Sequence, residues 1–246
     1  MKFIRKIRFV ILIFIVAFII ISLNIIVSPS HNLILFLSPY ICPNATYFVE
    51  TQNPVVAITI DDSPSDFTSK ILETLKKHNV KATFFPISSK VEKQSNIIKQ
   101  IISQNHEIGN HLTVDEPSIK LRNKFESELL KADKILSEFA TPVWLRPGYG
   151  FCNSQMVKTA KKHDYKIVLG SIWSYDTHLL SPQFSSWFIL RNIHPGAIIV
   201  LHDTSKSDRR GEKTIETLNI IIPQLKERGY QFATLTELVE STQKSR

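Results

Sequence analysis

The chain has 246 residues, of which 43% are hydrophobic and 21% charged, and its formal net charge is +8. This length and apolar content suffice for one sizeable globular core and exclude a wholly disordered protein. The basic residues form no stripe with interleaved aromatic side chains, so we predict no nucleic-acid site. The sequence indicates no protein partner either.

The N-terminus combines a basic cluster with a long apolar run. Four cations come first, and an uncharged stretch of 19 residues, 9–27, follows them. The cations are Lys2, Arg5, Lys6 and Arg8. As a helix, the stretch would span about 28 Å, close to the hydrocarbon thickness of a bilayer.

A cleaved secretory signal peptide and a buried core helix are the alternatives for this segment. The run is longer than the apolar region of about 7–15 residues in a signal peptide, and no Ala-x-Ala cleavage pattern follows it. The basic flank argues against a core helix. We therefore predict residues 1–27 as an uncleaved signal anchor that crosses the membrane once. Its N-terminus would be cytoplasmic and the rest of the chain extracytoplasmic, in a bacterial envelope or an endomembrane lumen.

Residues 28–53 contain three prolines and are predicted to be a linker, which leaves 54–246 as the globular domain. The chain has two cysteines, Cys42 and Cys152, a number that fits an exported domain with at most one disulfide. Two unpaired cysteines are the alternative, and the sequence does not decide between them.

From Pro54 onward, segments with strand and helix character alternate. The expected strands are 55–60, 82–87, a short one near Glu107, 142–146, 166–170, 197–201 and 230–234. The expected helices are 66–78, 93–104, 121–139, 154–163, 183–192, 213–228 and a short one from Thr236. Such alternation predicts parallel βαβ units, and about seven of them favour a closed α/β barrel over an open sheet.

Unusual polar residues follow the expected strands. Asp61 and Asp62 end the first one, and Arg146, Asp176 and His202 come after later ones. Asp-Asp-Ser-Pro alone is ordinary turn chemistry. In a parallel barrel, however, these positions meet at one rim, which is where the active sites of such folds lie.

His111 and Asp115 are four residues apart, so one helical turn would place both side chains on one face. With a carboxylate from the end of the first strand, they would give three protein ligands and leave one position for water. That is the pattern of a catalytic metal site. The alternatives are a surface pair and a core histidine.

Six short motifs in this order resemble the NodB-homology polysaccharide deacetylases, carbohydrate esterase family four, over about residues 54–240. They are Thr59-Ile60-Asp61-Asp62-Ser63-Pro64, Lys81-Ala82-Thr83-Phe84-Phe85, His106-Glu107-Ile108-Gly109-Asn110-His111, Leu145-Arg146-Pro147-Gly148-Tyr149-Gly150, Trp173-Ser174-Tyr175-Asp176 and Ile199-Val200-Leu201-His202. The resemblance implies an irregular (β/α)7 TIM-like barrel that removes acetyl groups from N-acetylglucosamine units with a divalent metal.

Position by position, the resemblance implies that Asp61 is the general base and His202 the general acid. Asp62 and His111 would bind the metal, with zinc expected first and cobalt, manganese or nickel as alternatives. A metal-bound water is acidic enough to attack an amide near neutral pH.

Three further roles follow from the same resemblance. Arg146 would orient Asp61, the Tyr149 N–H would help to hold the oxyanion, and Leu201 would line the acetyl pocket. The substrate would be a glycan that contains N-acetylglucosamine, such as a chitooligosaccharide or peptidoglycan.

The chain departs from the family pattern at three places. Asp115 stands where the second metal histidine is usual, and we expect its carboxylate to bind the metal instead. Gly148 replaces a frequent proline in the loop before Tyr149. Leu179 and Leu180 occupy the place of a second aspartate and its aromatic neighbour, so either Asp176 or His178 would accompany His202.

Two other functions stay open. The chain could be a saccharide-binding or scaffold protein that kept the fold after losing turnover. It could also hydrolyse a different non-peptide carbon–nitrogen bond, because loops rather than folds set specificity.

Overall fold

The computed structural model describes residues 11–12, 14–19, 22, 31–179, 181–204 and 209–243. Residues 37–246 group into one compact unit and residues 1–36 into another. Most of the predicted anchor, 1–27, lies outside the described residues. Within the described part of the chain, no helix is both long enough and apolar enough to cross a bilayer.

The predicted strands and helices are present, and most strands are shorter than expected. The strands are β1 (Val55–Asp61), β2 (Thr83–Phe85), β3 (Glu107–Ile108), β4 (Trp144–Leu145), β5 (Lys166–Ile167), β6 (Ile172–Trp173), β7 (Ile198–His202) and β8 (Gln231–Ala233). The helices are α2 (His31–Ile41), α3 (Thr68–Lys77), α4 (Ser88–Val91), α5 (Ser95–Ser103), α6 (Phe125–Leu136), α7 (Ser154–Lys162), α8 (Pro182–Asn192), α9 (Arg210–Glu227) and α10 (Leu235–Gln243). Strand β6 and the short helix α4 were not predicted, and neither was α2, which lies in the segment 28–53 that was predicted to be a linker.

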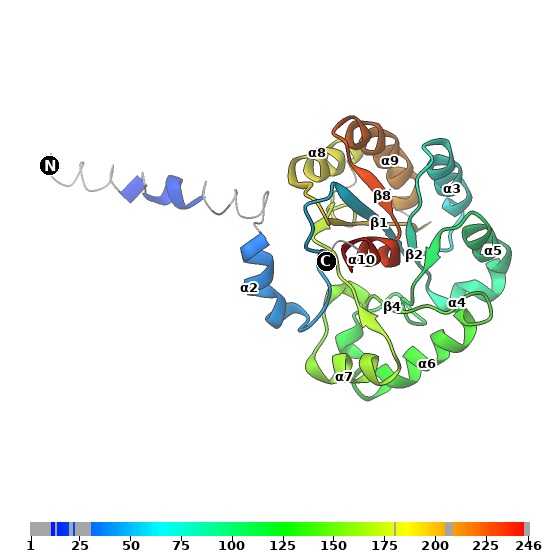
Figure 1. The fold of residues 1–246 in the computed structure, drawn as a ribbon. Coiled ribbons are helices and arrows are strands. Elements are labelled where there is room, and N and C mark those ends of the chain that lie inside the picture. Colours follow the sequence, from blue (N-terminus) through cyan, green and yellow to red (C-terminus); the bar gives the residue numbers. More distant parts are fainter. Residues whose placement is uncertain are drawn as a thin grey trace, which may run out of the picture. The chain divides into compact units, whose positions relative to one another are not determined.

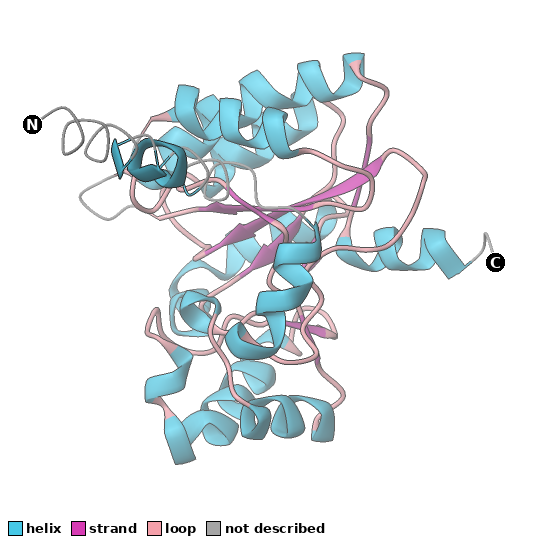
Figure 2. Cartoon of the chain, turned by 90° about the vertical axis from the view of Figure 1, so that its left-hand side faces the viewer, coloured by secondary structure: helices cyan, strands magenta, loops and turns pink. Residues whose placement is uncertain are grey.

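All strand ladders are parallel, as the alternation predicts. Six strands form one sheet in the order β3-β2-β1-β7-β6, with β8 also paired to β1, and β4 pairs with β5. A bridge between Asn110 and Leu145 links the two sheets. Helices α3 to α9 lie in a ring around the strands, and α10 lies across their middle (Figure 1). The view in Figure 2 shows helices on both sides of the strands.

The expected closed barrel of seven strands is only partly confirmed. The described residues contain eight strands in two sheets, and their ladders do not close into one barrel. The barrel does not close next to β5 and β7, because the segment 46–48 makes only single bridges there and no ladder. These bridges pair Thr46 with Val168 and Phe48 with Ala197.

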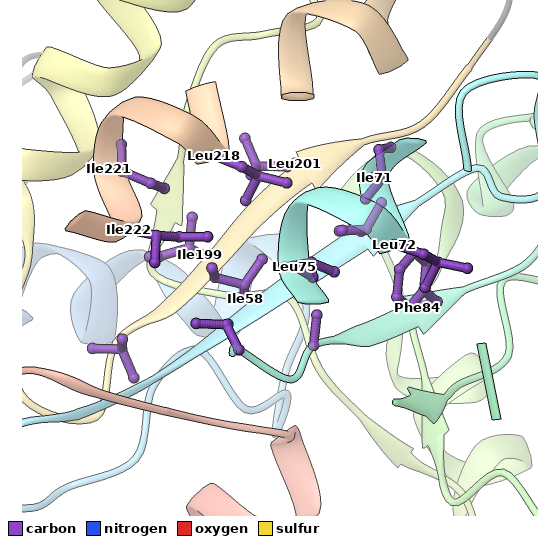
Figure 3. Packing of buried hydrophobic residues seen from close by; sticks show 14 of the residues in the cluster. Ile58, Ile71, Leu72, Leu75, Phe84, Ile199, Leu201, Leu218, Ile221 and Ile222 are labelled. Carbon is purple, nitrogen blue, oxygen red and sulfur yellow. The ribbon is translucent and has the colours of Figure 1, made fainter. Parts of the chain in front are cut away.

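The strands carry two apolar faces, because side chains alternate along them. One face of β1 and β7 packs under α3 and α9 (Figure 3). This cluster includes Ile58, Ile60, Ile71, Leu72, Leu75, Ile199, Leu201, Leu218, Ile221 and Ile222. The opposite face, with Ala57 and Ile198, packs with Phe85, Trp144 and the α10 residue Leu238. Burial of each of these aliphatic side chains contributes about 1.5–3 kcal/mol to the free energy of folding, relative to leaving it exposed to water.

A disulfide joins Cys42 to Cys152, which answers the question that the sequence left open. The Cys152 N–H also donates to the Ile41 carbonyl at 3.1 Å, and the Thr46 N–H donates to the Ile167 carbonyl at 2.8 Å. Cys42 is fully buried. From this residue onward, the segment predicted as linker is therefore packed on the domain.

Candidate functional site

The carboxyl ends of β1 and β7 bring the opening carboxylate pair next to His202. Asp61 is paired in register with His202 on one side and with Phe85 on the other. Asp61 and Asp62 are each only 3% exposed. Asp62 has a positive φ of 69°, which turns the chain sharply where the strand ends.

Arg146 reaches Asp61 from the end of β4. Its Nη1 donates to Asp61 Oδ1 and to Thr59 Oγ1, both at 2.7 Å, and its Nε donates to the Val168 carbonyl at 3.3 Å. The guanidinium lies over the Phe85 ring, 4.3 Å from its centroid. Burial lowers the pKa of Arg146, and the Asp61 charge opposes this effect. The geometry therefore has the arginine–aspartate contact that the sequence predicts.

Gly109 makes room for this arrangement. A Cβ atom at Gly109 would lie 2.3 Å from the Phe85 ring. The Phe85 ring, over which Arg146 lies, therefore requires a glycine at position 109, directly after β3.

His111 faces Asp62. The distance from its Nε2 to Asp62 Oδ1 is 3.6 Å, and its Nδ1 lies 2.7 Å from the Arg146 carbonyl. A backbone acceptor at Nδ1 leaves Nε2 available as a ligand, which is how metal-binding histidines are commonly held. The donor pair of Asp62 and His111 thus fits two positions of a divalent metal.

Asp115 does not join this pair. Residues 111–117 form a loop instead of the expected helical turn, so that expectation is wrong. The Asn110 side chain accepts the Leu112 N–H at 2.8 Å, and Leu112 has a φ of 63°, which starts the chain along a non-helical path. Among the described residues, no three His, Cys, Asp or Glu side chains are grouped to hold a metal ion.

His202 is paired with Asp176. Its Nδ1 lies 3.0 Å from Asp176 Oδ1, and its backbone N–H donates to Asp176 Oδ2 at 2.9 Å. Burial disfavours the charge on His202, but the Asp176 carboxylate outweighs this effect and raises the pKa to about 9. Burial likewise opposes the charge on Asp176, and His202 nevertheless brings its pKa below the usual value. His178, the other candidate, is instead 2.7 Å from the hydroxyl of Thr177.

Tyr149 lies in the turn Gly148–Gly150 that follows β4. Its φ is 62°, and its side chain is 63% exposed. The Gly148 N–H is held by Ser118 Oγ at 2.6 Å.

Leu201 does not reach the site. It is fully buried in the cluster under α9, because strand alternation points it away from His202. Val200 precedes His202 by two residues, so the two side chains lie on the same face of β7. The Ser174 hydroxyl donates to the Val200 carbonyl. Counting back by two from His202 would have identified Val200 as the site-facing residue.

Sequence reasoning also missed a buried group next to the ends of β1 and β7. Asp203 is fully buried, accepts from the hydroxyls of Ser65 and Thr68, and donates its N–H to the Asp61 carbonyl at 2.8 Å. Burial raises the pKa of Asp203 to about 6. Lys90 donates to the Asp62 carbonyl at 2.6 Å. The sequence signal that could have identified this group is the pair of hydroxyl residues Ser65 and Thr68, which follow Asp61 and Asp62 closely in the chain.

Comparison with known proteins gives consistent results. Residues 48–168 match the polysaccharide deacetylase family. A peptidoglycan-N-acetylglucosamine deacetylase of Bacillus cereus is 36% identical over 192 residues, which are 76% of this chain and 69% of that protein.

Two solved structures have the same fold. A peptidoglycan N-acetylglucosamine deacetylase aligns with a TM-score of 0.75 and 34% identity, over 80% of this chain and 93% of that one. A family-four pseudoenzyme from Bacillus anthracis aligns with a TM-score of 0.70 and 29% identity, over 80% of this chain and 69% of that one. Members of this family generally use a divalent metal. With its site geometry and these likenesses, the chain belongs to the polysaccharide deacetylase family, carbohydrate esterase family four.

Proposed function

We propose that this chain is a metal-dependent deacetylase that removes N-acetyl groups from an N-acetylglucosamine-containing glycan of the peptidoglycan kind. The observation that carries the proposal is the meeting of two ion pairs at adjacent strand ends, one of them buried and the other with a partly exposed histidine. Asp61 is held by Arg146, His202 is held by Asp176, and Asp61 and His202 are paired in register. The relatives named as peptidoglycan deacetylases support the substrate class.

The two pairs divide the acid and base roles. Asp61 takes the proton of the attacking water, and Arg146 keeps its carboxylate in one orientation. The Asp176 carboxylate raises the pKa of His202 to about 9, which favours the protonated imidazole that can give its proton to the leaving amine. The Tyr149 N–H supports the oxyanion from the turn after β4.

Asp62 and His111 would hold the metal. We propose Asp115 as the third ligand, which requires the loop 111–117 to bring its carboxylate to this pair, because no three such side chains are grouped among the described residues. When bound there, a zinc, cobalt, manganese or nickel ion supplies an acidic water and polarises the substrate carbonyl. Two carboxylates and one imidazole make an oxygen-rich set, which suits zinc and also favours harder metals.

The test is acetate release from N-acetylglucosamine oligomers and from peptidoglycan, with each metal supplied in turn and with a chelator as control. We expect release with metal, none with chelator, and at least a hundredfold loss in Asp61→Asn and His202→Gln. Absence of acetate from all of these substrates with all of these metals would refute the proposal.

A binding protein without turnover is the second candidate. It is favoured by the similarity to a pseudoenzyme and by the lack of a three-residue metal cluster among the described side chains. This candidate predicts saccharide binding that is unchanged by chelator and by Asp61→Asn. Chelator-sensitive acetate release excludes it.

We also propose that the N-terminal segment anchors the domain outside the cytoplasm. The basic cluster and the 19-residue apolar run support this proposal, and the described residues 11–12, 14–19 and 22 within the run are helical. Fractionation tests it, because the full chain should stay with membranes after a high-salt wash. A chain that is released by salt would exclude a spanning anchor.

A further inference from the structure

Asp203 connects the two strands that carry the proposed base and the proposed acid. It follows His202 directly in the chain, and its N–H donates to the Asp61 carbonyl at 2.8 Å. Asp61 and His202 are the last register pair of the β1–β7 ladder, so this hydrogen bond ties the strands together just past that pair. Asp203 itself is fully buried.

The Asp203 side chain holds the turn that follows Asp62. The hydroxyls of Ser65 and Thr68 donate to its two carboxylate oxygens. Because an ionised carboxylate only accepts, each hydroxyl gives its hydrogen to Asp203 and keeps its oxygen as an acceptor. Thr68 Oγ1 accepts the Ser65 N–H at 2.7 Å, and Ser65 Oγ accepts the Phe67 N–H at 3.0 Å. The carboxylate therefore sets the direction of these hydrogen bonds in the turn.

The turn begins with a residue that needs such support. Asp62 has a φ of 69°, a conformation that residues other than glycine seldom adopt. On the side of β2 and α4, the Ile87 N–H donates to the Ser63 carbonyl at 2.8 Å, and Lys90 donates to the Asp62 carbonyl at 2.6 Å. Of the contacts named, the Asp203 side chain is the one that joins the turn to the strand of the proposed acid.

The first turn of α9 closes over this cluster. A Cβ atom at Gly211 would lie 2.8 Å from Asp203 Oδ1 and 2.6 Å from the Cβ atom of Phe67. The Gly211 N–H donates to the Thr204 carbonyl at 3.2 Å, which holds the start of the helix at this place. A buried carboxylate depends on its protein partners, because water does not replace them. Loss of the Asp203 contacts therefore loosens the turn.

We propose that Asp203 is a positioning residue that holds the turn 62–68 against the strand of His202, so that Asp61, Asp62 and His202 keep one fixed arrangement. This inference rests on the proposed function and deepens it. Asp203 takes no proton and binds no metal in it, and acts only through the residues that do.

The test uses Asp203→Ala and Thr68→Val in the full chain. One measurement is kcat and KM for acetate release from N-acetylglucosamine oligomers with zinc supplied. The other is the zinc affinity of the chelator-treated protein, by competition with a chromophoric chelator. We expect kcat to fall and zinc binding to weaken, each about tenfold or more, as loss of outer contacts to ligands commonly does. KM should change little, because the variants misplace reacting groups and leave the sugar contacts in place.

A conservative variant should restore part of the loss. Asp203→Asn keeps the size of the side chain and one acceptor oxygen, but its NH₂ group meets one of the two hydroxyls. We expect its kcat and zinc affinity to lie between those of the wild type and Asp203→Ala. Values as low as those of Asp203→Ala would show that the remaining acceptor does not hold the turn, which would contradict the inference.

Thr74→Val is the matched control for Thr68→Val. Both threonines are buried in α3, but the Thr74 hydroxyl donates to the Lys70 carbonyl of its own helix, at 2.9 Å. The same chemical change at Thr74 should leave kcat and zinc affinity unchanged. Equal losses in the two valine variants would assign the effect to the stability of α3 and overturn the inference.

The outcomes also separate this inference from the proposed function. If the wild type binds zinc and releases acetate while Asp203→Ala and Thr68→Val match it in kcat and zinc affinity, only the inference fails. If the wild type neither binds zinc nor releases acetate, the proposed function fails and the inference fails with it. Thr68→Val adds no bulk, so it keeps the test decisive if Asp203→Ala does not fold.

Discussion

Arg146 is the buried cation of the site, and its side chain is only 3% exposed. We expect Arg146→Met to lower the free energy of unfolding by about 3–5 kcal/mol, because it leaves the Asp61 carboxylate buried without its partner. Urea unfolding measures the change. Arg146→Lys should recover only part of it, since one ammonium cannot reproduce the contacts to Asp61, Thr59 and Val168.

The exposed Lys162–Glu126 pair provides the control for this prediction. Lys162→Met removes a cation of the same charge from the surface, where solvent screens it, and should change stability much less. Equal effects of the two methionine variants would contradict the assignment of Arg146 as a buried, partnered charge.

The His202–Asp176 pair predicts how stability depends on pH in the chelator-treated protein. The pKa of His202 is about 9 in the folded chain and about 6.5 when unfolded, so its stabilising contribution is complete below pH 6.5. It is lost as the pH rises to 9, by about 1–3 kcal/mol. Urea unfolding at pH 6 and pH 9.5 measures the loss, which His202→Gln should abolish. A flat profile in the wild type would refute the raised pKa.

Individual residues differ in how far the sequence could place them. Asp61, Asp62, Arg146 and His202 were predictable, because each lies at the end of a strand or directly after it and parallel strands end at one edge. The path of the chain from His111 to Asp115 was not, because the Asn110 side chain turns it at Leu112. Spacing alone does not contain that hydrogen bond.

At the scale of elements, the sequence predicted all the strands except β6, but it overestimated the length of most of them. β1 is recognisable from an unbroken apolar run, whereas β6 has two residues, one of which is the 41% exposed Trp173. Barrel closure depends on pairings of such short strands. The bridges made by Thr46 and Phe48 are shorter still, since each is a single bridge, so hydrophobic periodicity could not predict them.

Glu107 fastens three elements together at the start of β3. Its carboxylate accepts from Thr83 Oγ1 of β2 at 2.8 Å, and from both the N–H and the hydroxyl of Thr236 in α10. We expect Glu107→Ala to lower the free energy of unfolding by about 1–3 kcal/mol, because these donors lose their partner. Thermal or urea unfolding measures the change.

A conservative variant distinguishes hydrogen bonding from packing at this place. Glu107→Gln keeps the size of the side chain and one acceptor oxygen, so it should lose less stability than Glu107→Ala. If both variants are equally destabilised, the hydrogen bonds to β2 and α10 are not the cause.

At the scale of the molecule, the domain begins earlier in the chain than the sequence predicts. The sequence placed its start at Pro54, yet residues 37–246 form one compact unit that includes the disulfide between Cys42 and Cys152. A fragment that starts at Thr51 would lose this bond, the Thr46 bridge to Val168 and the buried Tyr47. The segment before Pro54 is therefore part of the folded domain.

We expect fragment 37–246 to be more stable than fragment 51–246 by at least the contribution of the disulfide, about 2–5 kcal/mol, because the bond closes a long loop and restricts the unfolded chain. Urea unfolding of both fragments under oxidising conditions measures the difference. Changing Cys42 and Cys152 together to serine in 37–246 isolates the bond, because the Thr46 bridge and Tyr47 remain. That variant should fall between the two fragments. If it equals 51–246, packing of residues 42–49 adds nothing, and if it equals 37–246, the disulfide does not stabilise the domain.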